Sequence, residues 1–332
     1  MRYLVTGGAG FIGSHIVEQL LKDGHFVRVL DNFSSGKAEN LAFVDKLATR
    51  KTYELSIGDI SDNVTCDNAC KDIDYVLHQA ALRSVPKSMK EPESYNDVNI
   101  GGTLTLLQAA HKNKIKRFVM ASSSSVYGDT DQFPEREDFY PVLISPYALS
   151  KLANEYYCRI FSTHYGLETI CLRYFNVFGP KQALDDEYAV VIPKFIHCIL
   201  HNEHPPVFGT GMQSRDFTYI DNVVQANIKA SITPVETRLV GEPYSVNRGL
   251  SMHEVFNVAN GKDNTVLELV DCLNTIIGKD IKPKLLPVRA GDVFRTNADI
   301  SKIKRMLKYE PKVSFEEGLS RTVGYFKQKY GK

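Results

Sequence analysis

Hydrophobic and polar residues follow two alternating patterns along the first half of the chain. Short apolar runs of the kind found in buried strands occupy residues 3–5, 26–30, 52–57, 75–78, 117–121 and 169–174. Stretches that repeat apolar residues every three or four positions, as helices with one buried face do, occupy residues 11–21, 98–113 and 146–165. Strands that alternate with helices predict an α/β fold, a Rossmann-like doubly wound parallel sheet with helices on both faces.

The pattern changes after about residue 176. Short strands and helices there mix with proline and glycine, and two Ser/Thr-x-x-Glu patterns, at Thr265 and Ser314, predict helix starts. We therefore expect a first domain over residues 1–175 and a smaller α/β domain over residues 176–332. The second domain should cover a cleft at the carboxyl ends of the strands, with a boundary that is interleaved in sequence.

Composition and charge narrow the classes of function. The 332 residues include 40 Lys and Arg against 39 Asp and Glu, a net charge of +1, whereas a nucleic-acid binder needs clustered cations. The six cysteines include one close pair, Cys66 and Cys70, so we expect neither a disulfide framework nor a metal site. We also expect a reduced, cytoplasmic setting, with no targeting segment and no membrane partner.

The first candidate chemistry lies between the first predicted strand and the first predicted helix. Residues 7–13 read Gly-Gly-Ala-Gly-Phe-Ile-Gly, with Gly7, Gly10 and Gly13 at a spacing of three. Such a loop turns tightly and lets the backbone approach a pyrophosphate at the helix N-terminus. Asp31 ends the second strand, where a carboxylate accepts hydrogen bonds from the adenosine ribose and repels a 2′-phosphate. The first domain is therefore predicted to bind NAD rather than NADP.

A second candidate lies in the predicted helix 146–165. Tyr147 and Lys151 are four residues apart there, so their side chains share one face. A free tyrosine has a pKa of about 10 and is a poor base at neutral pH. A nearby ammonium and a positive nicotinamide ring would favour the phenolate and lower that pKa. Serines 122–125 follow a predicted strand and offer hydroxyls to a substrate oxygen, so the combination predicts proton transfer beside a nicotinamide.

Seven motifs run in order through most of the chain: residues 6–14 (TGGAGFIGS), 78–81 (HQAA), 122–128 (SSSSVYG), 145–151 (SPYALSK), 172–180 (LRYFNVFGP), 214–217 (SRDF) and 289–293 (RAGDV). On these motifs the sequence resembles the extended short-chain dehydrogenase/reductases, in their branch of NAD-dependent nucleotide-sugar epimerases. Within that branch it most resembles the UDP-glucose and UDP-N-acetylglucosamine 4-epimerases. The resemblance implies a UDP-sugar substrate and a homodimer formed through helices 98–113 and 146–165.

The resemblance also implies roles for single residues. Ser123 would be the catalytic hydroxyl, Tyr147 the base, and Lys151 the residue that lowers the base's pKa and holds the nicotinamide ribose. The residues expected at the cofactor are Gly7, Gly10, Phe11, Ile12, Gly13, Asp31, Asn32, Asp59, Ile60, Gln79, Ala80, Ala81, Asn99, Ser122, Tyr147, Lys151 and Tyr174. The residues expected at the substrate are Arg83, Ser123, Ser124, Asn176, Val207, Arg215, Arg289, Asp292 and Thr296.

Alternatives stay open at several of these positions. Asp59 could be an ordinary loop acid, and Val207 could pack in the core rather than beside the uracil. Arg215 and Arg289 suit a diphosphate, because guanidinium offers paired donors, but each could form a surface ion pair.

The expected reaction follows from the acidic residues that related enzymes carry and this chain lacks. Related 4,6-dehydratases carry an Asp-Glu pair, and related decarboxylases a Glu, where this chain has Ser124 and Ser125. Inversion at C4 of the sugar is the expectation that remains. A Tyr at the position of Thr296 would restrict the site to plain hexoses, and the smaller Thr should admit an N-acetyl group. We expect interconversion of UDP-GlcNAc and UDP-GalNAc, with UDP-Glc and UDP-Gal as further substrates.

Two other functions are compatible with the sequence. UDP-glucuronate 4-epimerase is one, because the SSSSVYG run and Arg83 also occur in that branch. A non-catalytic NAD-binding regulator is the other, although the chain keeps all three of Ser123, Tyr147 and Lys151.

Overall fold

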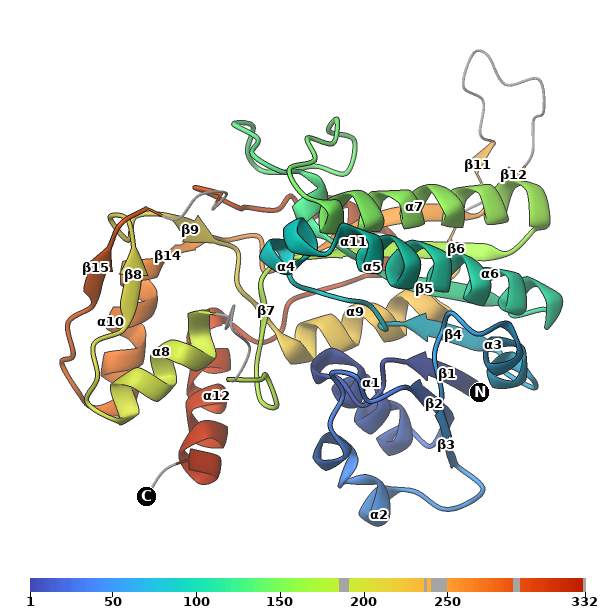
Figure 1. Cartoon of the computed structure of the whole chain (residues 1–332), viewed down its shortest axis with the longest axis horizontal. Helices are drawn as coiled ribbons and strands as arrows, with labels where there is room; N and C mark the ends of the chain where they lie inside the picture. The colour runs from blue at the N-terminus through green and yellow to red at the C-terminus, as the bar shows by residue number, and fades with distance from the viewer. Residues whose placement is uncertain (185–190, 236–237, 240–249, 289–292, 331–332) are drawn as a thin grey trace.

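The computed structural model describes residues 1–184, 191–235, 238–239, 250–288 and 293–330. A seven-stranded sheet with the order β13-β6-β5-β4-β1-β2-β3 lies at its centre (Figure 1). Its strands are β1 Arg2–Thr6, β2 Phe26–Asp31, β3 Tyr53–Ile57, β4 Tyr75–His78, β5 Arg117–Ser123, β6 Glu168–Tyr174 and β13 His253–Val258. All neighbouring strands of this sheet pair in parallel, as the alternating pattern predicts.

Helices cover both faces of the sheet, because the side chains of each strand point to opposite faces in turn. In β1, Tyr3 and Val5 belong to one buried cluster and Leu4 to the other. The first cluster includes side chains of α1 (Phe11–Lys22) and α9 (Ile220–Ile232). The helices that contribute to the second cluster are α3 Asn63–Cys70, α6 Gly102–Lys112 and α7 Pro146–Tyr165.

Short elements complete the architecture. Those between the sheet strands are η1 Ala38–Leu41, α2 Val44–Leu47, α4 Val85–Lys90, α5 Pro92–Tyr95, the π-helix η2 Asn96–Gly101 and η3 Ser124–Val126. The helices of the second half, besides α9, are α8 Val191–Leu200, α10 Val266–Ile277, α11 Ser301–Leu307 and α12 Phe315–Tyr330. Its short strands pair as β7 Val177–Phe178 with β10 Thr218–Tyr219, β8 Pro206–Phe208 with β15 Lys284–Leu286, β9 Ser214–Arg215 with β14 Asn264–Thr265, and β11 Arg238–Leu239 with β12 Leu250–Ser251.

The chain returns to the central sheet after residue 175. The helix α9 packs against β5 and β6. The strand β13 pairs with β6 over its whole length, from His253 opposite Thr169 to Val258 opposite Tyr174. A division at residue 175 therefore does not follow the sheet, because one strand and one covering helix come from beyond it. The elements α8, α10 and α12 form a separate lobe beside the sheet (Figure 1).

One expected helix start and one expected capping interaction differ from the structure, while the helix starts expected at Thr265 and Ser314 are confirmed. The predicted helix 98–113 is divided into the π-helix η2 and α6, which begins at Gly102. Gly102 has no room for a side chain, since a Cβ there would lie 2.7 Å from Ile60. The capping box of Thr265 with Glu268 is complete. At α12 the Glu317 N–H donates to the Ser314 hydroxyl, but the Glu317 carboxylate accepts a hydrogen bond from Arg321.

No helix among the described residues is long and apolar enough to cross a membrane. No group of three or more His, Cys, Asp or Glu side chains within the described ranges could hold a metal ion.

Candidate active site

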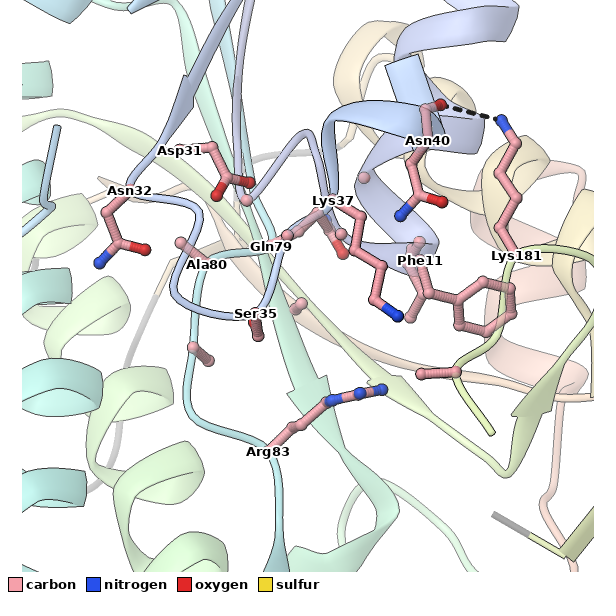
Figure 2. Close-up of a pocket in the computed structure, with 18 of the residues that line it drawn as sticks. Phe11, Asp31, Asn32, Ser35, Lys37, Asn40, Gln79, Ala80, Arg83 and Lys181 are labelled. Carbon is pink, nitrogen blue, oxygen red and sulfur yellow. Dashed lines mark hydrogen bonds between the residues drawn. The ribbon is translucent and has the colours of Figure 1, made fainter. Parts of the chain in front are cut away.

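A pocket lies at the carboxyl ends of the parallel strands, beside the point where the strand order reverses (Figure 2). Open parallel sheets bind their ligands at such a point. The expected cofactor residues in its wall are Gly7, Gly10, Phe11, Ile12, Gly13, Asp31, Asn32, Asp59, Ile60, Gln79, Ala80, Ala81, Ser122, Tyr147, Lys151 and Tyr174. Arg83, which was expected at the substrate, lines this same pocket. The structure thus brings together residues from seven segments that lie far apart in the sequence.

The glycine loop shapes one side of the pocket. Gly7 has φ +67°, and a Cβ on it would lie 2.7 Å from the backbone nitrogen of Ala80. A Cβ on Gly13 would lie 2.1 Å from the Gly7 carbonyl oxygen, so the loop can only be built with glycine there. The helix α1 starts with Gly10 as its N-cap, and no side chain caps its first turn. Its first N–H groups are therefore available to an anion at the helix N-terminus.

Carboxyl groups mark the other side of the pocket. Asp31 is 7 % exposed, and its Oδ2 accepts the Ala9 N–H of the glycine loop at 2.8 Å. Asn32 donates to the Asp59 carboxylate at 2.7 Å. Partial burial acts to raise the pKa of Asp59, but hydrogen bonds from Ser61 and Asn32 outweigh it and hold the pKa below its usual value. This side of the pocket therefore suits the hydroxyls of a ribose better than a phosphate.

Three lysines in the wall were missed by sequence reasoning, and two of them, Lys181 and Lys329, come from the second half of the chain. The ammonium of Lys329, at the end of α12, lies 2.8 Å from the Glu39 carboxylate. Lys181 donates to the Asn40 carbonyl at 3.2 Å, a contact drawn in Figure 2, and lies 3.2 Å from the Glu18 carboxylate. No motif connects either lysine to its partner, because the contacts join segments that are far apart in the chain. Together they link the second half of the chain to the outer rim of the cofactor pocket.

Replacing Lys329 by alanine is expected to speed the release of NAD. The ion pair with Glu39 is largely exposed, and such a pair contributes up to ~1 kcal/mol, which corresponds to a rate increase of up to about fivefold. Stopped-flow fluorescence of the NADH-loaded protein measures the release rate. Lys327→Ala on the same helix is the control, and equal release rates for the two variants would contradict a role of the Lys329–Glu39 ion pair in retaining NAD.

The three expected catalytic residues converge at the end of β5. Ser123 is the last residue of β5, and its hydroxyl accepts the Ser125 N–H at 3.2 Å. The helix α7 presents Tyr147 and Lys151 to the pocket, and its start is fixed by Ser145, whose hydroxyl accepts the Ala148 N–H. The Lys151 ammonium donates to the Ala121 carbonyl at 2.8 Å and lies 5.8 Å from the centre of the Tyr147 ring.

The pKa values in this group differ from the expectation. Burial raises the pKa of Tyr147, and hydrogen bonding with Ser123 and the charge of Arg83 oppose that rise without overcoming it. Burial also lowers the pKa of Lys151 to about 8. In the chain alone, Lys151 therefore does not give Tyr147 a lowered pKa, because desolvation of the phenolate is the larger effect.

Three expected cofactor residues use their polar side-chain atoms within the protein. The Ser122 hydroxyl donates to the buried Glu155 carboxylate. The Tyr174 hydroxyl bonds Asn227 and Gln79. Both residues still line the pocket, so their backbone and ring remain for a ligand. Asn99 lies behind the wall, where its side-chain amide donates to Ser150 at 3.0 Å and exchanges hydrogen bonds with the backbone of Leu82.

The expected substrate residues fall into two groups. Asn176, which has φ +33°, donates from its amide to the Thr296 hydroxyl at 2.9 Å, so two of them are in direct contact. Arg215 lies in β9 beside them and donates to the Ser214 carbonyl at 2.8 Å. Val207 is 1 % exposed within the core, so its side chain packs as the alternative interpretation held. Ser124 begins η3 and is partly buried.

Two more of the expected substrate residues, Arg289 and Asp292, lie outside the described residues. Among the expected substrate positions, Asn176, Arg215 and Thr296 therefore form the cluster that the structure defines.

Comparison with known proteins gives one family. A family model described as the NAD dependent epimerase/dehydratase family matches residues 3–246. The fold is similar to the crystal structure of a UDP-glucose 4-epimerase with UDP-glucose from Thermotoga maritima. That structure is 38% identical, covers 99% of both chains and has a TM-score of 0.88.

Two further solved structures differ in the sugars that they bind. A UDP-N-acetylglucosamine 4-epimerase from Methanobrevibacter ruminantium, in complex with UDP-N-acetylmuramic acid, is 40% identical with a TM-score of 0.87, covering 99% of this chain and 98% of that one. A UDP-glucuronic acid 4-epimerase from Bacillus cereus, in complex with UDP-glucuronic acid and NAD, is 32% identical with a TM-score of 0.85, covering 99% and 100%.

Proposed function

Because the chain belongs to the NAD-dependent epimerase/dehydratase family, we propose that it inverts C4 of UDP-sugars and interconverts UDP-GlcNAc and UDP-GalNAc. UDP-Glc and UDP-Gal are proposed as further substrates. The observation that carries the proposal is that Tyr147 and Lys151 line the cofactor pocket, and that Ser123, at the end of β5, hydrogen-bonds Tyr147. The structure of a UDP-N-acetylglucosamine 4-epimerase that is 40% identical to this chain supports the choice of sugar.

The pocket fits NAD. The uncapped first turn of α1 offers N–H groups to the pyrophosphate, and Asp31 offers carboxylate oxygens to the adenosine ribose. Bound NAD supplies the acceptor and then the donor of the C4 hydride. Lys151, whose ammonium donates to the Ala121 carbonyl, would hold the nicotinamide ribose.

Tyr147 and Ser123 act on the sugar. Tyr147 removes the proton of the 4-hydroxyl and returns it at the end, and Ser123 hydrogen-bonds the same oxygen. Since burial raises the pKa of Tyr147 in the chain alone, the phenolate depends on the positive charge of the oxidised cofactor. The 4-keto sugar would turn in the cleft, where the bound cofactor would supply hydride to its other face. Binding of the UDP portion retains the substrate in the cleft while its sugar ring rotates.

Thr296 is proposed to set the space for the sugar 2-substituent. Thr296→Tyr is expected to lower kcat/KM for UDP-GlcNAc by about a hundredfold while UDP-Glc changes little, because a ring fills the space of the acetyl group. Product ratios resolved by NMR measure the effect for wild type and variant. Ser301→Tyr, at an exposed site, is the matched control. Wild-type protein that leaves both acetylated sugars unchanged would sink the first choice of substrate.

UDP-glucuronate is the second candidate substrate. It is favoured by the charge of Arg83 in the pocket, by the serine run 122–125, and by the similarity to the Bacillus cereus enzyme. The same product assay with UDP-glucuronate decides between the two. Conversion of that sugar alone would replace the first proposal.

We also propose a homodimer and a cytoplasmic location. The helix α7 exposes Leu149, Tyr156 and Ile160 at spacings of seven and four, an apolar stripe suited to a second copy of the chain. Sedimentation equilibrium tests the dimer.

A further inference from the structure

Residues 294–298, here called the Thr296 strand, are held in register by β9. Thr296 donates its N–H to the Ser214 carbonyl at 3.1 Å and accepts the Asp216 N–H at 3.0 Å. Its hydroxyl is fixed in turn by the Asn176 amide. The position of Thr296, which is proposed to set the space for the sugar 2-substituent, therefore depends on where this strand lies.

Two buried carboxyl groups accept hydrogen bonds from the backbone of the Thr296 strand, directly after Thr296. Glu135 is 1 % exposed and accepts the Asn297 N–H at 3.0 Å, while its own N–H donates to the Asn297 carbonyl at 2.7 Å. Asp216 is fully buried and accepts the Ala298 N–H at 3.3 Å. Asp216 also accepts the N–H groups of Asn260 and Gly261, each at 2.9 Å. The strand is thus tied to two separate parts of the protein directly after Thr296.

Burial raises the pKa of both carboxyl groups. Burial raises the pKa of Glu135 to about 8, with the charge of Asp216 adding to the rise and those of Arg215 and Arg295 opposing it. Burial likewise raises the pKa of Asp216 to about 7. A neutral Glu135 carboxyl would accept the Asn297 N–H less strongly than a carboxylate, so its hold on the strand rests on the geometry of the contacts. The Glu135 Oε1 has no hydrogen-bond partner within the part of the chain that the structure describes, and Oε2 accepts the Asn297 N–H.

We propose that Glu135 and Asp216 are positioning residues that set the place of Thr296 in the substrate site and so govern how UDP-sugars fit. Neither residue is expected to touch the sugar, since both act through the backbone of the Thr296 strand. The proposal rests on the proposed function for its effect on substrate, but its effect on the strand is independent of it.

The test compares three variants of Glu135 in the NAD-loaded protein. Glu135→Ala removes the acceptor of a buried N–H and is expected to raise KM for UDP-GlcNAc about tenfold with kcat within about twofold. Glu135→Gln keeps an acceptor oxygen in the same place and should remain close to wild type. Glu135→Asp shortens the side chain by one methylene, so its KM for UDP-GlcNAc should lie between those of the other two variants. It replaces the alanine variant in the comparison if that variant does not fold.

Hydrogen–deuterium exchange over residues 294–299 gives the readout that does not depend on substrate. Glu135→Ala should speed exchange there, whereas Glu137→Ala should not. Glu137 is the matched control because its carboxylate accepts the Asn257 N–H and not one from the Thr296 strand. Unchanged exchange in Glu135→Ala would show that Glu135 does not hold the Thr296 strand. Faster exchange with an unchanged KM would show that the position of the strand does not govern UDP-sugar binding. Inactive wild-type protein with the expected exchange pattern would point to failure of the proposed function alone.

Discussion

Tyr147→Phe is expected to lower kcat by about a thousandfold while the protein still binds NAD, because the variant loses the proposed base for the C4 hydroxyl proton. The ring itself has a structural place, packed edge-to-face on Tyr95 with the centroids 6.4 Å apart, and phenylalanine preserves that contact. Turnover of the best UDP-sugar and the NAD content of the denatured protein measure the two properties separately.

Tyr156→Phe is the matched control for this change. Tyr156 lies on the same helix but is 56% exposed on the outer side. It should retain wild-type turnover. If Tyr147→Phe retained turnover within tenfold of wild type, another group would have to be the base.

Gly13→Ala is expected to weaken NAD binding by about a hundredfold, the effect of forcing one methyl group into a site without space. The added Cβ would lie 2.1 Å from the Gly7 carbonyl oxygen and 2.8 Å from Gly8 Cα, and both are backbone atoms that cannot rotate away. The loop would have to open, which would move the first N–H groups of α1 away from the pyrophosphate. Calorimetric titration of NAD into the cofactor-free protein measures the change.

Gly324→Ala provides the comparison for Gly13→Ala. Gly324 lies within α12, and a Cβ there meets nothing within 4 Å. Alanine favours a helix over glycine, so this variant should unfold at the same or a higher temperature and bind NAD normally. Equal affinity for NAD in both variants would show that the glycine loop does not depend on close approach.

The sheet and the cofactor pocket could be predicted because their signals are local. Six of the seven sheet strands lie where short strand-like runs were expected, whereas β13, which mixes polar and apolar residues, was not expected. The glycine loop, Asp31 and the Tyr147–Lys151 spacing each occupy a short stretch of sequence. Parallel strands then bring these stretches to one edge of the sheet without further information. The family motifs give the order of the pieces for the same reason.

The contacts that sequence reasoning missed join distant segments. Glu135 bonds to Asn297, and Lys329 to Glu39, with no pattern in the sequence to mark either pair. The rise in the pKa of Tyr147 was also hidden, because the extent of burial depends on what packs around the helix. The hydrogen bond from Ser122 to Glu155 could not be predicted either. The sequence does not show whether a serine hydroxyl is free or already bonded to another side chain.

The late return of the chain to β6 has a consequence for biosynthesis. A ribosome releases β1 to β6 well before it releases β13, so the nascent chain first carries β6 as an edge strand with unpaired N–H and C=O groups. Such an edge recruits other extended chains until its own partner arrives. A fragment cut near residue 175 would contain the whole glycine loop and still leave this edge uncovered. We therefore expect the fragment to aggregate, and the cofactor domain to mature only after most of the chain has been made.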